Sequence, residues 1–204
     1  MSQVNELKSI GRFIIIGATV ALLTGCGGFN PEKVDTSSVS ISKEGKITSV
    51  TIDSFSEDYY DIEELEEMAN SEISSFNIEY GEDSAVLSSI KKEDDNIRMI
   101  MEFESASDYS HFNQKAMFYG TVAEAISRGY ELPSDLVDAE GNSVTSETIS
   151  GLSDEHIIIM AEKINVITPY KIKYMTSGVT LEDSNEAILS GTSEDSNVYL
   201  ILVK

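Results

Sequence analysis

The stretch VYLILV, from Val198 to Val203, is apolar at every position and carries the clearest information about the fold. Successive side chains of a β-strand point to opposite faces of its sheet, so a strand formed here presents two apolar faces. Strands of this kind are found where both faces of the sheet are covered. We therefore expect Val198–Val203 to form a central or covered strand.

Short apolar segments of similar character precede this strand and make the last quarter of the chain rich in β-structure. Turn-forming residues separate them at Pro169, Ser177-Gly178, residues 183–185 and residues 191–197. The segments are HIIIMA, INVIT, KIKYM, VTLE and EAILSG. Strands this closely spaced are typical of an antiparallel meander.

Extended patterns also occur nearer the start of the chain. Residues 39–53, VSISKEGKITSVTID, are predicted to form two strands joined at Glu44-Gly45. Residues 91–96 are predicted to form a turn before the strand IRMIMEFE. In that strand the large apolar residues alternate, at Ile97, Met99, Met101 and Phe103. Alternation places them on one face of a sheet, which favours core packing of the methionines over ligation of copper(I).

Two helices are predicted between the strands. The first begins at Asp61, which forms a capping box with Glu64. The second begins with Thr121 and Glu124 in the same relation and stops at Gly129. The apolar face of the first helix consists of Ile62, Leu65, Met68, Ala69, Ile73 and Phe76. Its glutamates resemble a metal cluster only superficially, and we expect them to form a solvated face: Glu63, Glu64, Glu66 and Glu67.

These patterns predict an α+β fold: an antiparallel, meander-like β-sheet with two main helices packed on it and a β-rich C-terminal part. We expect residues 39–204 to form a single acidic α+β domain. Residues 105–130 are helical in character, and residues 132–155 are expected to form an extended loop that has room for a short turn of helix. Asp138 begins a segment that is similar to a calcium loop, but its glycine stands at the fourth position, which favours a plain turn.

The charge of the chain limits its partners. Acidic residues outnumber basic ones by 36 to 14, which gives a formal net charge of −22. Such a surface repels DNA, RNA and anionic lipid headgroups, so we expect no nucleic-acid partner. It attracts basic partners and tolerates divalent cations, while the simplest role of the acidity is solubility.

The N-terminal residues have the layout of a secretory signal peptide. Lys8 and Arg12 precede the run from Phe13 to Leu23, which has eleven residues and no charge. A helix of that length covers roughly 16 Å, about half of a hydrocarbon core of ~30 Å, so it is too short for an ordinary membrane-spanning helix.

The four residues Leu23-Thr24-Gly25-Cys26 end this run and contain the only cysteine of the chain. They resemble the lipobox of bacterial lipoproteins, in which an aliphatic and two small residues precede an obligatory cysteine. The resemblance implies cleavage between Gly25 and Cys26 and attachment of diacylglycerol to the Cys26 thiol. Residues 1–25 would then be a cleaved signal peptide, and residues 26–38 the lipidated cysteine followed by a flexible tether.

The best candidate for a ligand site is an aromatic stretch beside polar groups. Its residues are Tyr109, His111, Phe112, Phe118 and Tyr119. Aromatic rings next to polar side chains line many ligand pockets and protein contacts, and they also cap sheets as core residues. The sequence leaves these two interpretations open.

Sequence motifs give no indication of catalysis. The chain has no phosphate-binding glycine loop, dinucleotide-binding glycine motif, zinc-protease motif or nucleophile elbow. Its two histidines, His111 and His156, are far apart in the sequence, which argues against a histidine-rich metal site. A pair of serine and histidine, or of carboxylates, stays open. We predict neither catalytic residues, nor a cofactor, nor a metal site.

These observations predict a lipid-anchored lipoprotein on the extracytoplasmic face of a bacterial cell membrane. We expect it to be a non-enzymatic interaction or assembly module that is held by the lipid on Cys26 and binds a basic or envelope protein. The alternative is a lipoprotein that binds a small ligand or a cation through the aromatic stretch around His111.

Overall fold

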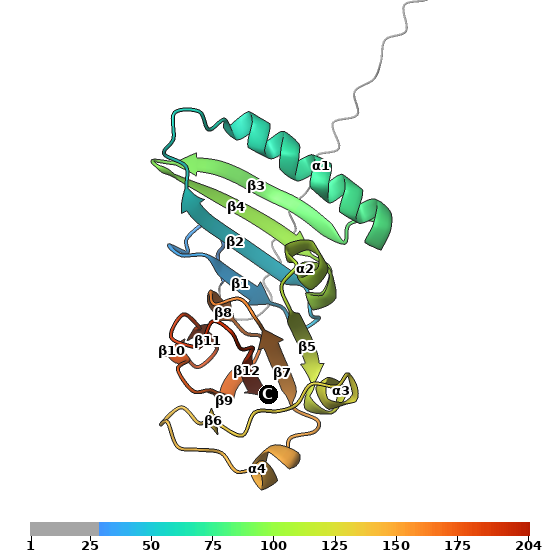
Figure 1. Cartoon of the computed structure of the whole chain (residues 1–204), viewed down its shortest axis with the longest axis vertical. Helices are drawn as coiled ribbons and strands as arrows, with labels where there is room; N and C mark the ends of the chain where they lie inside the picture. Colours follow the sequence, from blue (N-terminus) through green and yellow to red (C-terminus); the bar gives the residue numbers. More distant parts are fainter. Residues whose placement is uncertain (1–28) are drawn as a thin grey trace, which may run out of the picture.

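The computed structural model describes residues 29–204, and the predictions for the signal peptide, Gly25 and Cys26 lie outside the described residues. Within this range four helices and twelve strands form an α+β fold with a β-rich C-terminal part (Figure 1), so the predicted fold class is confirmed. The strands form two sheets, whereas a single sheet was expected. Alternation within a strand shows which residues share a face, but it does not show which strands pair.

The larger sheet, sheet A, has seven strands. Nearly all neighbours are antiparallel; only β1 and β8 run parallel. In spatial order its strands are β10 (Thr180–Asp183), β11 (Glu186–Ile188), β8 (Asn165–Ile167), β1 (Ser38–Ile41), β2 (Ile47–Ser54), β4 (Asn96–Phe103) and β3 (Ala85–Glu93). Strand β1, from the N-terminal part of the described chain, and strand β8, from its C-terminal part, therefore lie side by side within sheet A.

The smaller sheet, sheet B, is antiparallel throughout. Its order is β5 (Met117–Thr121), β7 (His156–Met160), β12 (Val198–Val203), β9 (Lys171–Thr176) and β6 (Leu136–Val137). The stretch VYLILV is β12, the central strand, as predicted. Leu200, Ile201 and Leu202 have no exposed surface, which is the consequence of covering both faces of that strand.

The two faces of sheet B belong to two separate hydrophobic cores. The first core lies between the sheets: Leu200 and Leu202 of β12 meet Val39 and Phe103 of sheet A there. The second core lies on the opposite face of sheet B, where Ile201 packs with residues of α3 (Val122–Ser127) and α4 (Ser146–Ser150). Burying apolar surface is the main favourable term in folding, so β12 contributes to the stability of both cores.

The longest helix, α1 (Ile62–Tyr80), lies along β3 and is drawn at the top of Figure 1, away from sheet B. Asp61 caps its start by accepting hydrogen bonds from the backbone amides of Glu63 and Glu64. Ile73 is its only fully buried residue. Met68, expected on the apolar face, is 63% exposed.

Residues 105–130 are not continuously helical. They form α2 (Ala106–Asn113), the strand β5, and the short helix α3. At the start of α3 the predicted capping box is present: Thr121 accepts from the Glu124 amide, and the Glu124 carboxylate accepts from the Thr121 amide. The segment Met117–Thr121 becomes a strand because its backbone pairs along the whole of β7.

The segment before β1 is held against sheet A, although it was expected to belong to a flexible tether that ends at Ser38. The Arg98 guanidinium of β4 donates to the carbonyl oxygens of Pro31 and Val34, at 3.2 and 2.7 Å. Near the start of β1, the Ser37 hydroxyl is bonded to both backbone groups of Ile52. The composition of residues 29–38 does not reveal these partners on distant strands.

Among residues 29–204, no helix combines the length and the hydropathy that are needed to cross a membrane.

Candidate functional site

The structure distributes the predicted aromatic stretch over different surroundings. Tyr109 is buried in the first core, and its hydroxyl donates to the Glu162 carboxylate. The Tyr109 ring contacts the Phe103 ring edge to face, with 5.3 Å between the ring centroids. The Phe112 ring also contacts the Phe103 ring, at 5.4 Å. These two aromatic residues therefore pack as core residues beneath α2.

Phe118 and Tyr119 are neighbours on β5, so their side chains point to opposite faces of sheet B. Phe118 lies in the second core, 5.4 Å from the ring of Tyr130. Tyr119 packs against the first core. One ligand cannot contact both side chains on one surface, so the five residues of the stretch do not form a common pocket.

His111 lies on the surface at the end of α2. Its ring stacks on Tyr80 of α1 at 4.9 Å, and Tyr80 stacks on Phe76 at 4.4 Å. His111, Tyr80 and Phe76 thus form a row of stacked rings, which the sequence did not predict. This row fastens the C-terminal ends of α1 and α2 to each other.

A second aromatic group surrounds His156 at the start of β7. The imidazole lies between Tyr119, at 5.4 Å, and Tyr170, at 5.1 Å between ring centroids. The Tyr119 hydroxyl and His156 Nδ1 are buried and have no hydrogen-bond partner among the described residues. Burial, followed by the nearby Lys204 ammonium, lowers the pKa of His156, and burial raises the pKa of Tyr119. The protein therefore favours the neutral form of both groups.

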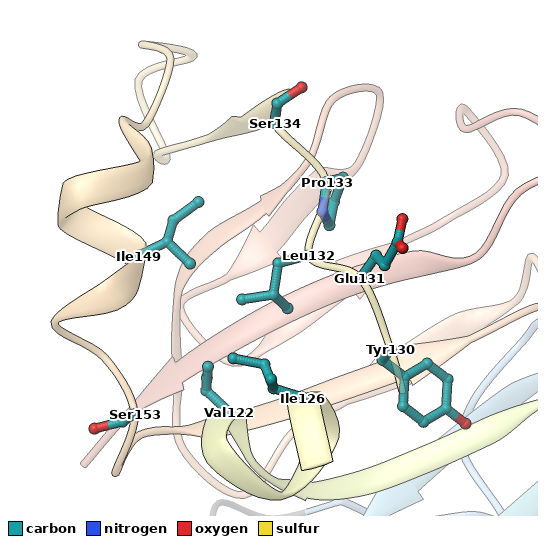
Figure 2. A pocket seen from close by; sticks show the side chains of 9 residues that line it. All are labelled: Val122, Ile126, Tyr130, Glu131, Leu132, Pro133, Ser134, Ile149 and Ser153. Atoms are coloured by element: carbon teal, nitrogen blue, oxygen red, sulfur yellow. The ribbon is translucent and has the colours of Figure 1, made fainter. Parts of the chain in front are cut away.

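A cavity of about 400 Å³ opens over the second core (Figure 2). Helices α3 and α4 and the segment that leads to β6 surround it. Its lining residues are Val122, Ile126, Tyr130, Glu131, Leu132, Pro133, Ser134, Ile149 and Ser153. In Figure 2, Leu132 and Ile149 face Val122 and Ile126 across the space. The lining is mainly aliphatic, and this volume lies within the range of small-molecule sites, about 300–1,000 Å³.

The sequence did not point to this cavity because residues 132–155 were expected to form an extended loop. A local signal for α4 is nevertheless present: Thr145 caps the helix by accepting from the Thr148 amide. Threonine is among the residues preferred at a helix N-cap, because its hydroxyl oxygen accepts a hydrogen bond from a free amide of the first turn. None of the five aromatic residues chosen from the sequence lines the cavity.

The exposed surface of α1 is a second candidate site. The helix contains six glutamates and no lysine or arginine. Two large non-aromatic apolar side chains are exposed among them, Met68 at 63% and Ile78 at 88%. Contiguous exposed apolar surface with a polar rim is a property of many protein contact sites.

Metal ligation finds no support in the geometry of the described chain: residues 29–204 contain no group of three or more histidine, cysteine or acidic side chains placed to hold an ion. Comparison of the chain with protein-family models, with curated proteins and with solved structures gave no match.

Proposed function

We propose that this chain is a bacterial lipoprotein, anchored through Cys26 on the extracytoplasmic face of the cell membrane, that acts as a non-enzymatic interaction or assembly module. The residues Leu23 to Cys26 and the apolar run before them support the anchor. Two or three acyl chains hold a protein stably at a membrane, since each buried CH₂ contributes about 0.8 kcal/mol.

The position of the first described residues supports a domain held close to that anchor. Only Gly27 and Gly28 separate Cys26 from Phe29 in the sequence. Fully extended, three residues span at most about 10 Å. Arg98 fixes the chain again at Pro31. The module would therefore work near the membrane surface rather than at the end of a long tether.

The observation that carries the interaction role is the free surface of α1. A helix of 19 residues with one buried residue leaves most of its surface available to a partner. Its six glutamates favour a basic protein, and the exposed Met68 and Ile78 supply apolar contact area. We propose a basic or envelope protein as the partner, and no nucleic acid.

The alternative role, binding of a small ligand, has its support at a different place from the one the sequence suggested. The rings around His111 pack against one another, whereas the cavity between α3 and α4 has the size and lining of a ligand site. We therefore propose the cavity, rather than the aromatic stretch, as the place of any ligand binding.

The anchor is tested by expressing the full chain and its Cys26→Ala variant in bacteria supplied with an alkyne fatty acid. We expect label on the wild-type chain and retention in the membrane fraction, with both lost in the variant. Lys33→Ala, an exposed change near the same end, is the matched control and should keep both. Labelling that persists in Cys26→Ala contradicts the proposal.

The interaction role is tested with a photo-crosslinking amino acid at Ile78 in living cells. Crosslinks to a specific protein are expected from Ile78 and not from Glu140, an exposed position in a distant turn. Glu67→Lys should weaken them, because it reverses one charge of the α1 surface. Equal crosslinking from both positions, or none from Ile78, argues against α1 as the contact surface.

A further inference from the structure

We propose that the cavity between α3 and α4 binds a small amphiphile with a single aliphatic chain and a positively charged head. The chain would occupy the aliphatic interior, and the head would lie at the rim beside Glu131. This site is separate from the α1 surface, and its occupancy does not depend on the proposed anchoring or on a protein partner.

The interior of the cavity suits an aliphatic chain. Val122 and Ile149 form part of its wall and are almost fully buried, so the wall is fixed by the second core. Leu132 projects toward the space from the segment before β6 (Figure 2). A mainly aliphatic lining offers few hydrogen bonds, so it selects ligands that do not need any there.

The mouth of the cavity has apolar surface that a ligand would cover. Ile126 lines the cavity and is 55% exposed, although it belongs to α3, whose residues Val122 and Ala125 are buried. Removing such a side chain from water is favourable in proportion to the area covered. An aliphatic chain in the cavity would contact Ile126 and Ile149 at the same time.

The charge at the rim selects the head group. Glu131 is the only charged residue among those that line the cavity. Arg128, three positions before Glu131 in the sequence, is not in the lining; its guanidinium lies 5.2 Å from the ring of Phe118. Tyr130 adds an aromatic ring at the rim, which attracts cations through its face. The net charge of −22 further disfavours a carboxylate or phosphate head.

The test is calorimetric titration of the full chain with three probes of equal chain length: decylammonium, decanoate and decanol. We expect decylammonium to bind at one saturable site and about tenfold more tightly than decanoate, the order of effect that one nearby charge produces. Methyl NMR signals of Ile126 and Ile149 should shift on binding. Equal or tighter binding of decanoate, or no binding of decylammonium, overturns the proposal.

Three variants assign the binding to this cavity. Leu132→Trp fills the space and should abolish binding, whereas the control Tyr59→Trp, which places a tryptophan at a residue that is 75% exposed and lies before α1, should retain it. Ile126→Lys changes an exposed residue that the fold does not need buried, and it should reverse the preference from decylammonium to decanoate. Glu131→Gln should reduce the preference for the amine and leave decanol unchanged. Unaltered binding in both Leu132→Trp and Ile126→Lys places the site elsewhere and refutes the assignment.

Discussion

Replacement of Arg98 by methionine tests whether the segment before β1 is part of the folded domain. Methionine keeps an unbranched apolar stem and removes the guanidinium. That group is almost fully buried and donates to four oxygens: both carboxylate oxygens of Glu93, at 3.0 and 3.1 Å, and the carbonyl oxygens of Pro31 and Val34. The substitution therefore disconnects the segment from β4.

The expected loss follows from the environment of each contact. Glu93 is about half exposed, so its ion pair with Arg98 contributes at most about 1 kcal/mol. Hydrogen bonds that involve a charged group contribute about 1.5–3 kcal/mol each, and release of the segment rehydrates the Pro31 and Val34 carbonyls. We expect Arg98→Met to lower the free energy of unfolding by about 2–4 kcal/mol.

The assay is urea unfolding of the full chain, combined with hydrogen exchange at Ile52, whose amide is bonded to the Ser37 hydroxyl. Arg98→Met should increase exchange at Ile52 because Ser37 is no longer held in place. Glu93→Gln is the control that alters only the ion pair, and it should cost no more than about 1 kcal/mol. A decrease in unfolding free energy below about 0.5 kcal/mol for Arg98→Met, or equal decreases for both variants, contradicts the role of Arg98 in holding the segment before β1.

Three further substitutions test other parts of the structure. Tyr109→Phe leaves the Glu162 carboxylate without its buried donor, so it should lower the free energy of unfolding by about 1–2 kcal/mol in urea titrations; an unchanged midpoint contradicts the bond. The lowered pKa of His156 means that the unfolded chain binds the proton more tightly, so stability should fall as the pH drops below the ordinary value of 6.5. His156→Gln should flatten that part of the pH profile, and an identical profile argues against burial of the imidazole. Thr121→Ala removes the capping box of α3 and should cost about 1 kcal/mol, measured by thermal unfolding with the neighbouring exposed Ala123→Ser as control.

The parts of the fold that were predictable are those specified by local pattern. The unbroken apolar run Val198–Val203 requires cover on two faces, and the structure places it at the centre of sheet B. Asp61 and Thr121 start their helices because short polar side chains satisfy the free amides of a first turn. These features depend on residues within a few positions of one another.

The parts that were not predictable depend on distant partners. The parallel pairing of β1 with β8 joins Val39 to Val166, and no local pattern encodes that separation. The sequence did not predict that Phe118 and Tyr119 point to opposite faces of a sheet, because β5 is a strand only through its pairing with β7. The candidate cavity was missed for the same reason, since α3, α4 and Leu132 surround it only through their packing in the second core.

The most direct test of the account is the intact mass of the protein isolated from the membrane of a bacterium that processes lipoproteins. We expect a chain that begins at Cys26, with the mass of residues 26–204 plus diacylglycerol and, where the amino group is modified, one further acyl chain. A mass equal to the full 204-residue chain, or to a chain with an unmodified Cys26, contradicts this expectation.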